Sequence, residues 1–398
     1  MIAPWAWALL AARAGLGGCL AGFGVYTALS AWAAWQWRRA RRAPNTDWTP
    51  PVTLLKPVCG VDAEAYANFE SFCRLDYPAE RLQILFGALD PADPALALAE
   101  SLRAAYPSVD IGLVRGGANA PGGQNQKVRN LAAMLPAARH DLLVLCDSDM
   151  RVTPDYLRRV VAPFAPPAAG EAARPVGLVT CPYRGCRPAS LAAVLEALGI
   201  GADFIPSVLV SRALEGMAFA FGSTIVLPRA VLAALGGFEA LADDLADDYR
   251  LGRGAKHAGY AVVLSDYVVD DVLGRERFGP MWARRLRWAR TIRACRPAGY
   301  AGSVVTHGTA LALLFLAAMG FSPAGWAVAA GALALRMAVA CWIGAACTED
   351  TNILRYLPLL PVSDLVSFAL FVASFCGNRI TWRGERFRLL PGGKLARL

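Results

Sequence analysis

The sequence predicts a parallel α/β domain held at a membrane by apolar helices. Between Pro50 and Tyr300, short apolar runs alternate with helical stretches, which is the pattern of a parallel sheet covered by helices. Long apolar stretches lie towards both ends of the chain, in which 56% of the 398 residues are hydrophobic and 18% are charged. We therefore expect one α/β domain of roughly 250 residues between membrane anchors.

The N-terminal apolar run, Gly15–Trp35, has no charge and is long enough to cross a bilayer. One arginine precedes it, and a cluster of four follows it directly: Arg38, Arg39, Arg41 and Arg42. A cleavable signal peptide carries its positive charge before a shorter apolar core, so residues 1–37 are expected to be a retained anchor. The positive-inside rule then places the N-terminus outside and the chain from residue 38 onward in the cytoplasm.

Residues 38–279 supply the alternating elements of the expected cytoplasmic domain. Strands are expected at Val52–Leu55, Leu82–Leu89, Val109–Val114, Leu142–Cys146 and Val176–Cys181, and helices at Asn68–Leu75, Ala95–Tyr106, Lys127–Leu135 and from Pro154. The sequence has no Gly-x-x-x-x-Gly-Lys-[Ser/Thr] loop, and no Gly-x-Gly-x-x-Gly follows the first strand. These absences weaken the prediction of a kinase, an ATPase or an NAD enzyme.

Three further apolar stretches occupy residues 301–377. Val304–Phe321 and Pro323–Cys347 are separated by one residue and should form a tight hairpin, in which Arg336 must reach the membrane surface or another helix. Leu357–Cys376 is interrupted by two prolines and an aspartate. If all three stretches cross, the basic tail 378–398 lies outside, against the charge bias. The third stretch could instead be re-entrant or interfacial, and the sequence leaves this open.

The net charge is +9, and clusters of arginine lie beside the apolar segments. Such clusters are better suited to anionic lipid headgroups than to nucleic acid, so a membrane partner is expected and a nucleic-acid partner is not. The ten cysteines include no Cys-x-x-Cys pair, and free thiols in a cytoplasmic domain are the simplest interpretation.

The most informative stretch is the buried strand that ends in Asp147-Ser148-Asp149. Open α/β sheets bind ligands at the carboxyl ends of their strands. Two carboxylates there could hold Mg²⁺ or Mn²⁺, which commonly completes its shell with substrate phosphates. An ordinary Asp-Ser-Asp turn is an equally good interpretation of these residues taken alone.

Two further residues at strand and helix ends could contact a nucleotide. Asp90 ends the second strand and could accept from a base or a ribose hydroxyl, although a turn residue before Pro91 is the more common role. Lys127 follows a glycine-rich loop at a helix start and could contact the same ligand, although a solvated lysine is more common.

A tight acidic run precedes Tyr249 and consists of Asp243, Asp244, Asp247 and Asp248. If the whole run were helical, it would place like charges on one face at i, i+4, which costs stability unless something compensates. A general base near a metal ion is one use for such a cluster. A solvated acidic turn at a helix N-terminus is an equal alternative.

Residues 280–300 predict an amphipathic helix at the membrane surface, with an apolar face and many arginines. Arg284 or Arg287 could in addition pair with a diphosphate leaving group, because guanidinium forks match phosphate oxygens well. Trp288 follows in the same segment.

Taken in order, short motifs throughout the chain resemble the ceramide glucosyltransferase family, which comprises membrane-anchored inverting glycosyltransferases of the GT-A fold. The bacterial branch associated with hopanoid biosynthesis is the most similar part of it. The motifs are Leu54-Leu55-Lys56-Pro57, Gly60-Val61-Asp62, Leu75-Asp76-Tyr77-Pro78, Asp93-Pro94-Ala95, Asn125-x-Lys127-Val128-x-Asn130-Leu131, Cys146-Asp147-Ser148, Arg151-Val152-x-Pro154-Asp155, Asp248-Tyr249, Arg284-x-x-Arg287-Trp288 and Trp382-Arg383-x-x-Arg386-x-Arg388-Leu389.

The resemblance implies a role for each matching residue. Asp90, with Lys127 and Asp147, is expected to contact the nucleotide, and Asp147 with Asp149 to hold the divalent metal, Mn²⁺ or Mg²⁺. Asp248 is expected to be the catalytic base. The remaining motif, Arg284, Arg287 and Trp288, is expected to bind the diphosphate and border the acceptor.

The expected activity is transfer of glucose or N-acetylglucosamine from a UDP-sugar to a lipid hydroxyl, with inversion, by a multi-pass enzyme of a bacterial inner membrane. The acceptor would be ceramide or a hopanoid. Animal ceramide enzymes tend to have glycine where this chain has Asp149, and Ala202–Val210 is more similar to the hopanoid-associated branch and lacks a histidine of the animal enzymes. A polysaccharide synthase would need more spanning helices, and a non-enzymatic membrane adaptor would not bind UDP.

Overall fold

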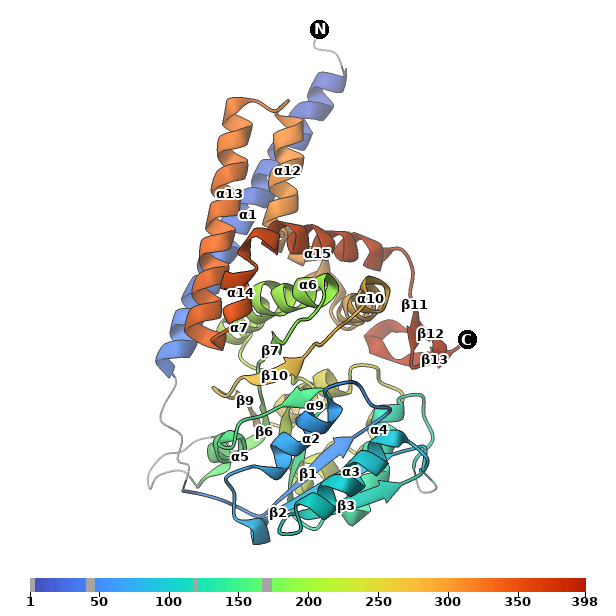
Figure 1. Cartoon of the computed structure of the whole chain (residues 1–398). Helices are drawn as coiled ribbons and strands as arrows, with labels where there is room; N and C mark the ends of the chain where they lie inside the picture. Colours follow the sequence, from blue (N-terminus) through green and yellow to red (C-terminus); the bar gives the residue numbers. More distant parts are fainter. Residues whose placement is uncertain (1–3, 41–46, 118–119, 167–173) are drawn as a thin grey trace. The chain divides into compact units, whose positions relative to one another are not determined.

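The computed structural model describes residues 4–40, 47–117, 120–166 and 174–398, which form two compact units (Figure 1). The helical unit comprises Met1–Ala40, Pro188–Leu214 and Arg275–Gly393. The α/β unit comprises Arg41–Arg187, Glu215–Gly274 and Lys394–Leu398. Segments distant in sequence therefore build each unit. Arg41 and Arg42, from the predicted arginine cluster, lie outside the described residues.

The α/β unit is built on a seven-stranded sheet of order β3-β2-β1-β4-β8-β6-β9. β8 runs antiparallel to β4 and β6, and the other neighbouring strands are parallel. The strands are β1 (Val52–Pro57), β2 (Leu82–Ala88), β3 (Asp110–Arg115), β4 (Leu142–Leu145), β6 (Val176–Thr180), β8 (Ile225–Pro228) and β9 (Ala261–Leu264). All five strands expected from the sequence are present, and the sheet is mixed because of β8.

Helices cover both faces of this sheet, because the central strands are apolar on both sides. Every residue of β1, β2 and β4 is buried. One buried cluster includes Phe69, Phe72 and Leu96, and the other, on separate residues of the same strands, includes Val128 and Leu131. The helices are α2 (Ala65–Cys73), α3 (Pro94–Ala105), α4 (Gln126–Met134), α5 (Tyr156–Val161), α8 (Arg229–Ala234) and α9 (Asp247–His257).

The predicted helix starts have identifiable caps. Asp93 accepts a hydrogen bond from the amide of Ala95 at 2.9 Å, and Pro94 occupies the first helical position of α3. Asn125 caps α4 by accepting from the amide of Val128 at 3.1 Å. β1 extends two residues further than expected, through Lys56 and Pro57. The Lys56 side chain can be buried in the strand because its ammonium donates a hydrogen bond to the Asp147 carbonyl.

A small second sheet of order β5-β10-β7 also belongs to the α/β unit. Its strands are β5 (Met150–Arg151), β7 (Tyr183–Cys186) and β10 (Val269–Val272). β5 begins directly after Asp149, and the Asp149 carbonyl accepts from the amide of Val272 at 3.1 Å. This sheet therefore fixes the backbone on the far side of the Asp147-Ser148-Asp149 turn.

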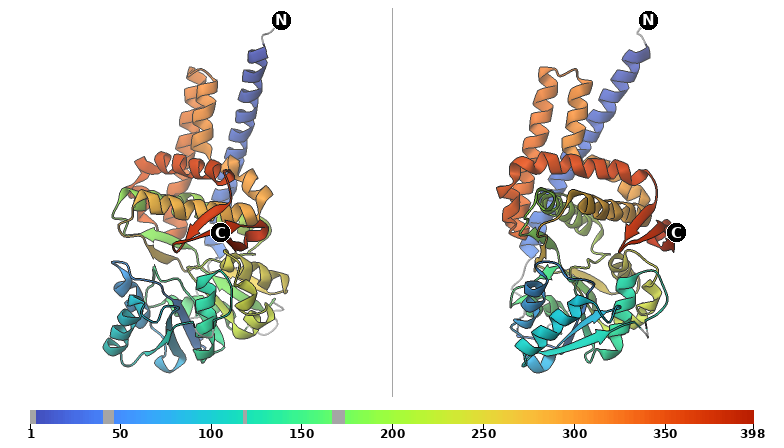
Figure 2. Two further views of the ribbon diagram at one scale, coloured as in Figure 1. Left: turned by 90° about the vertical axis from the view of Figure 1, so that its right-hand side faces the viewer. Right: turned by 45° about the vertical axis from the view of Figure 1, so that its right-hand side comes forward.

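The helical unit contains long apolar helices together with shorter polar ones (Figure 1 and Figure 2). The helices are α1 (Pro4–Ala40), α6 (Leu191–Gly199), α7 (Ile205–Glu215), α10 (Phe278–Cys295), α11 (Pro297–Gly302), α12 (Gly308–Ala318), α13 (Pro323–Ile343), α14 (Thr351–Arg355) and α15 (Leu360–Phe375). β11 (Arg379–Trp382) and β12 (Glu385–Leu389) form a hairpin in this unit, whereas β13 (Leu395–Arg397) belongs to the α/β unit.

Four helices in the described residues are long and apolar enough to cross a membrane, or five if a bent pair counts as one span. The four are Trp5–Ala40, Leu191–Glu215, Pro323–Thr348 and Leu357–Phe375. The bent pair, Pro297–Thr306 with Gly308–Ala318, turns by 63°. Within the apolar stretch Val304–Phe321, the regular α-helix α12 covers 11 residues, and a short turn joins it to α13 as the predicted hairpin requires. Leu191–Glu215 was not predicted, and 83% of its apolar window is buried within the protein.

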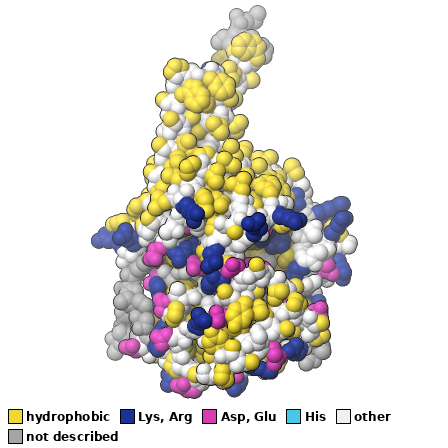
Figure 3. All heavy atoms as spheres, viewed as in Figure 1, with side chains coloured by type: hydrophobic (Ala, Val, Ile, Leu, Met, Phe, Trp, Pro, Cys, Tyr) yellow, Lys and Arg dark blue, Asp and Glu magenta, His cyan; other side chains and the backbone are white. Residues whose placement is uncertain are grey.

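The orientation of α15 bears on the open question of the third C-terminal stretch. α1, α12 and α13 run alongside one another, whereas α15 lies crosswise to α12 and α13 in all three ribbon views (Figure 1 and Figure 2). Hydrophobic side chains cover the α12–α13 hairpin, and Lys and Arg side chains gather around the β11–β12 hairpin (Figure 3). This arrangement favours the interfacial alternative for α15.

Candidate active site

Five of the predicted site residues belong to the α/β unit; two of these, Lys127 and Asp147, form an ion pair, and Asp248 lies close enough for their charges to act on it. Asp147 follows β4, Lys127 is the second residue of α4, and Asp248 is the second residue of α9. The Lys127 ammonium lies 2.6 Å from Asp147 Oδ1 and 3.7 Å from Asp247 Oδ2. We refer to Lys127, Asp147, Asp247 and Asp248 as the Lys127 cluster. It contains three carboxylates and one ammonium.

Gly222 joins the two key aspartates through its backbone. Its amide donates to Asp248 Oδ2 at 3.1 Å, and its carbonyl accepts from the amide of Asp147 at 3.1 Å. A Cβ atom at this position would lie 2.3 Å from Asp147 Oδ2 and 2.8 Å from the Lys127 nitrogen. Only glycine leaves room for the carboxylate and the ammonium here. Gly222 is not among the predicted site residues, because it lies in no sequence motif of its own.

The acidic run is held against the glycine-rich loop that precedes α4. The amide of Gln124 donates to Asp243 Oδ1 at 3.0 Å, and the Asn125 side chain donates to the Asp244 carbonyl at 2.7 Å and to Asp247 Oδ1 at 3.3 Å. α9 begins only at Asp247, so the predicted helical faces shared by Asp243, Asp244, Asp247 and Asp248 are wrong. The carboxylates are brought together by loop packing instead.

Burial without enough positive charge changes the proton affinity of the Lys127 cluster. Burial raises the pKa of Asp248 to about 7, and the nearby Asp247 adds to this, while Lys127 opposes it. Burial likewise raises the pKa of Asp247, with Lys127 opposing. Burial tends to lower the pKa of Lys127, but the three surrounding carboxylates outweigh it and raise that pKa. Lys127 therefore stays charged while Asp248 can exchange a proton near neutrality.

Asp149 and Asp90 lie at the same edge of the sheet as Asp147. The Asp149 carbonyl accepts hydrogen bonds from the Asn68 side chain and the Val272 amide, which fixes the backbone of the turn. The Asp149 side chain is exposed. Asp90 is exposed and accepts from the amide of Ala92 at 2.9 Å. Asp90 is therefore a turn residue, as its position before Pro91 indicated. Nucleotide binding by Asp90 stays a proposal, which its position at the carboxyl end of β2 supports.

Lys56 is a further residue that the sequence analysis did not place in the site. It is fully buried, and its ammonium donates to the Asp147 carbonyl at 2.7 Å and lies 3.9 Å from the centre of the Phe72 ring. Burial lowers the pKa of Lys56, while Cys146, Asp149 and Asp147 oppose this. A polar residue inside an otherwise apolar strand is the sequence signal that could have identified it.

The residues present fit a divalent cation of the predicted kind. Asp147 and Asp149 place carboxylates at the carboxyl edge of the sheet, and the carboxylates of the Lys127 cluster exceed its ammonium group in number. In the described ranges, no group of three or more His, Cys, Asp or Glu side chains could hold a metal ion. A bound cation would therefore need further oxygens from a substrate.

The three remaining predicted residues, Arg284, Arg287 and Trp288, belong to α10 of the helical unit. Arg284 forms salt bridges with Glu196, which is 1% exposed, and with Glu276 at 2.5 Å. Its guanidinium also lies 5.8 Å from the centre of the Trp288 ring. Arg284 is thus committed to two carboxylates of its own unit, which argues against its predicted role as a diphosphate ligand.

Arg287 differs from Arg284 in its surroundings. Burial lowers the pKa of Arg287 to about 10, with Arg284 and Arg383 adding to the effect. Its guanidinium lies 5.7 Å from the centre of the Trp382 ring. Of the two arginines between which the sequence could not choose, Arg287 is the one whose charge is not balanced by a carboxylate in the described part of the chain.

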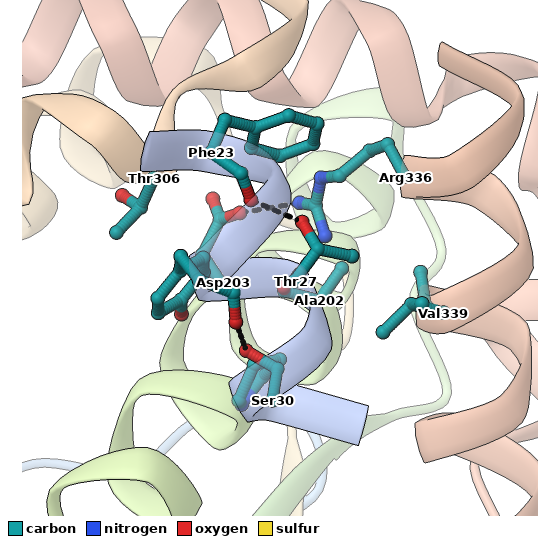
Figure 4. A pocket seen from close by; sticks show the side chains of 11 residues that line it. Phe23, Thr27, Ser30, Ala202, Asp203, Thr306, Arg336 and Val339 are labelled. Carbon is teal, nitrogen blue, oxygen red and sulfur yellow. Dashed lines mark hydrogen bonds and ion pairs between the residues drawn. The ribbon is translucent and has the colours of Figure 1, made fainter. Parts of the chain in front are cut away.

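A polar cavity of about 20 Å³ lies within the helical unit (Figure 4). Its lining includes Thr27, Ser30, Asp203 and Arg336. The two hydroxyls donate to carbonyls of their own helix, at 2.8 Å each. This volume has room for about one water molecule, so the cavity cannot hold a sugar or a lipid.

Comparison with known proteins decides the family. The profile of glycosyl transferase family 21 matches residues 19–395, which is nearly the whole chain. The chain belongs to this family. The predicted resemblance to ceramide glucosyltransferases is therefore confirmed, and the narrower assignment to the hopanoid-associated branch stays a prediction.

Relatives of known activity are similar over parts of the chain. A ceramide glucosyltransferase of Candida albicans is 34% identical over 119 residues, which cover 28% of this chain and 22% of the relative. Ceramide glucosyltransferase 1 of Caenorhabditis elegans is 26% identical over 218 residues, covering 55% and 44%. A β-monoglucosyldiacylglycerol synthase of Synechocystis is 31% identical over 121 residues, covering 30% and 24%. The chain spans less than half the length of these relatives.

A solved structure confirms the predicted GT-A fold. A mannosyltransferase from Pyrobaculum calidifontis, solved in complex with GDP-mannose and Mn²⁺, is similar with a TM-score of 0.54 and 20% identity. The similarity covers 92% of this chain and 99% of that protein. The chain therefore has this glycosyltransferase fold over nearly its whole length.

Proposed function

We propose that this chain is a membrane enzyme that transfers a hexose, glucose or N-acetylglucosamine, from a UDP-sugar to a lipid hydroxyl with inversion. The observation that carries the proposal is the Lys127 cluster at the carboxyl edge of a GT-A sheet. Relatives named for glucosyl transfer to ceramide and for a glucosyldiacylglycerol support a lipid acceptor.

Asp248 is the proposed base. Its pKa near 7 suits a group that must be ionised at neutral pH and still accept a proton from the acceptor hydroxyl. The deprotonated oxygen attacks the anomeric carbon from the face opposite UDP, and the bond to the diphosphate breaks. One displacement converts an α-linked donor into a β-linked product.

Charge that develops on the diphosphate needs positive partners. Asp147 and Asp149 would hold the divalent cation, Mn²⁺ or Mg²⁺, which supplies Lewis-acid stabilisation of the leaving group when bound. Lys127 fixes the orientation of Asp147 through its 2.6 Å ion pair. Arg287 is the proposed arginine ligand of the diphosphate, because Arg284 is already paired with Glu196 and Glu276.

A three-span topology is also part of this proposal. If α1, α13 and the bent pair that ends in α12 cross the membrane and α15 lies in its interface, the basic tail falls on the same side as Arg38 and Arg39. This removes the conflict with the positive-inside rule and leaves the catalytic domain in the cytoplasm of a bacterial inner membrane. Trp288 and Ile292 of α10 are exposed apolar side chains suited to that interface.

The proposal is tested by reconstituting the full chain in vesicles with UDP-glucose or UDP-N-acetylglucosamine, Mn²⁺ and either ceramide or a hopanoid. Mass spectrometry of the extracted lipids should show a hexosylated acceptor that disappears when EDTA is added. Calorimetry with UDP and Mn²⁺ excludes a non-enzymatic adaptor if heat of binding is measured. No product with any donor–acceptor pair and no UDP binding would overturn the proposal.

A further inference from the structure

Two arginines from different elements of the helical unit approach the same indole ring. The guanidinium carbon of Arg287, on α10, lies 5.7 Å from the centre of the Trp382 ring, and that of Arg383 lies 5.8 Å from it. Both distances are within the range of cation–π interactions. Trp382 is half-buried at the end of β11, so the ring is a fixed platform for two positive charges.

These two charges lack an anionic partner in the described part of the chain. Among the described residues, neither Arg287 nor Arg383 forms a salt bridge, whereas Arg284, one turn earlier on α10, binds two carboxylates. The positive charge of Arg383 also acts unfavourably on Arg287. Like charges held close together favour the binding of an anion between them.

The backbone at Arg383 gives independent support. Arg383 has φ of +50° and Gly384 has φ of +81°, and these two residues form the whole loop between β11 and β12. A two-residue hairpin loop with both residues left-handed is a type I′ turn, which favours Asn-Gly. An arginine in the first position is strained, and such strain persists mainly where the side chain has a function.

We propose that Arg287, Trp382 and Arg383 form a binding site for a phosphate group. Guanidinium forks donate paired hydrogen bonds to phosphate oxygens, and two of them suit a doubly charged or bridged phosphate. The phosphate can come from the diphosphate of the sugar donor or from a phospholipid headgroup. If the phosphate is the donor diphosphate, the site rests on the proposed function and adds Arg383 and Trp382 to the donor site. If it is a phospholipid headgroup, the site does not depend on sugar transfer.

The most informative variant is Arg383→Asn. It removes the guanidinium and creates Asn-Gly, the favoured type I′ pair, so the hairpin should fold at least as well as in the wild type. The matched control is Arg386→Gln, which removes one positive charge from an exposed site on β12 of the same hairpin. Arg386 makes no cation–π contact with Trp382.

The measurement is the unfolding temperature of the full chain in a neutral detergent, titrated with three probes. The probes are UDP with Mn²⁺, dihexanoyl phosphatidic acid, and uridine as the phosphate-free control. Ligands that bind the native state raise the unfolding temperature by an amount that grows with the logarithm of ligand concentration over Kd. We expect Arg383→Asn to weaken at least one phosphate probe by about tenfold, while Arg386→Gln and the uridine response stay unchanged.

Each outcome decides the proposal. Loss of the UDP response identifies the donor diphosphate as the source, and loss of the phosphatidic acid response identifies a lipid headgroup. Equal responses of Arg383→Asn and the wild type to both phosphate probes would overturn the site, as would an equal loss in Arg386→Gln. A wild type that responds to neither phosphate probe would also overturn it. If the wild type makes glycolipid and Arg383→Asn responds to both phosphate probes as the wild type does, this site alone is refuted. A wild type that makes no glycolipid refutes the proposed function.

Discussion

Two buried charged clusters, one in each unit, differ in their balance of charge. The Lys127 cluster has three carboxylates for one ammonium, and burial raises the pKa of Asp248 to about 7. The second cluster pairs Arg336 with Asp364 at 2.7 Å and with Asp203 at 2.5 Å. Ser367 donates to Asp203 at 2.6 Å and accepts from Arg285 at 2.8 Å, so two arginines face two aspartates. We refer to this second set as the Arg336 cluster.

This difference in charge balance indicates a structural role for the Arg336 cluster and a chemical role for the Lys127 cluster. In the Arg336 cluster both carboxylates accept from arginine and from a hydroxyl, since Thr309 also donates to Asp364. Such a closed network holds helices together and needs no ligand. The Lys127 cluster is left with excess negative charge at a sheet edge, which is the condition under which a cation and a proton are bound.

The largest expected effect is on the chemistry of the Lys127 cluster. Asp248→Asn should lower the rate of sugar transfer by about 10²- to 10⁴-fold, because the amide cannot accept the hydroxyl proton. UDP binding measured by calorimetry should be nearly unchanged. Asp243→Asn is the matched control, because Asp243 is exposed and an amide oxygen can still accept from Gln124. Unchanged turnover in Asp248→Asn would remove this residue from the role of base.

The Arg336 cluster should respond in stability instead. Arg336→Met leaves Asp364 buried without its cation and should lower the free energy of unfolding by about 3–5 kcal/mol. Turnover per folded molecule should be kept. The double variant Arg336→Met/Asp364→Leu should recover part of the stability, because the buried charge of Asp364 is then gone while the more exposed Asp203 still lacks its cation. Thermal unfolding in detergent measures both, and a single variant as stable as the wild type would contradict a structural role.

A smaller effect is expected from crowding the Lys127 cluster. Gly222→Ala places a methyl group where Asp147 Oδ2 and the Lys127 ammonium now lie, so the carboxylate must turn away. We expect transfer to fall by about 10- to 100-fold, with little change in unfolding temperature. Gly122→Ala is the control, because a Cβ there has no atom within 4 Å. Equal activities of the two variants would show that the position of this carboxylate is unimportant.

The smallest predicted effect is on pH dependence. Asp248 acts as a base only when it is ionised, so kcat/KM should rise with pH through about 7, and at pH 6 it should be about one tenth of its plateau. The stability of the fold changes with pH in the opposite direction. Because the folded-state pKa is raised from 3.8, protonation of Asp248 stabilises the fold at low pH, and this contribution is lost as pH rises towards 7. A flat kcat/KM profile between pH 6 and 8 would contradict the assignment.

Much of the α/β unit could be predicted because its signals are local. Apolar runs of strand length, the Asp93 and Asn125 caps and the carboxylates after β4 are each visible within a few residues. The placement of β8 was not predicted, because its antiparallel pairing joins β4 to β6 across more than 40 residues. The 63° bend before α12 was not predicted either, since hydropathy does not report it.

The sequence by itself determined the fold class, the family and the residue types of the site, because strand periodicity, membrane-length apolar runs and the ordered motifs are properties of neighbouring residues. Only the tertiary structure decided which charges remain unbalanced. Arg284 and Arg287 are one turn apart on α10, yet one is paired with Glu196 and Glu276 and the other lies beside Arg383. Gly222 joins the site through its hydrogen bonds with Asp147 and Asp248, and Lys56 through its hydrogen bond to the Asp147 carbonyl. Coulomb energies depend on distances in space, and those distances arise from contacts between residues far apart in the chain.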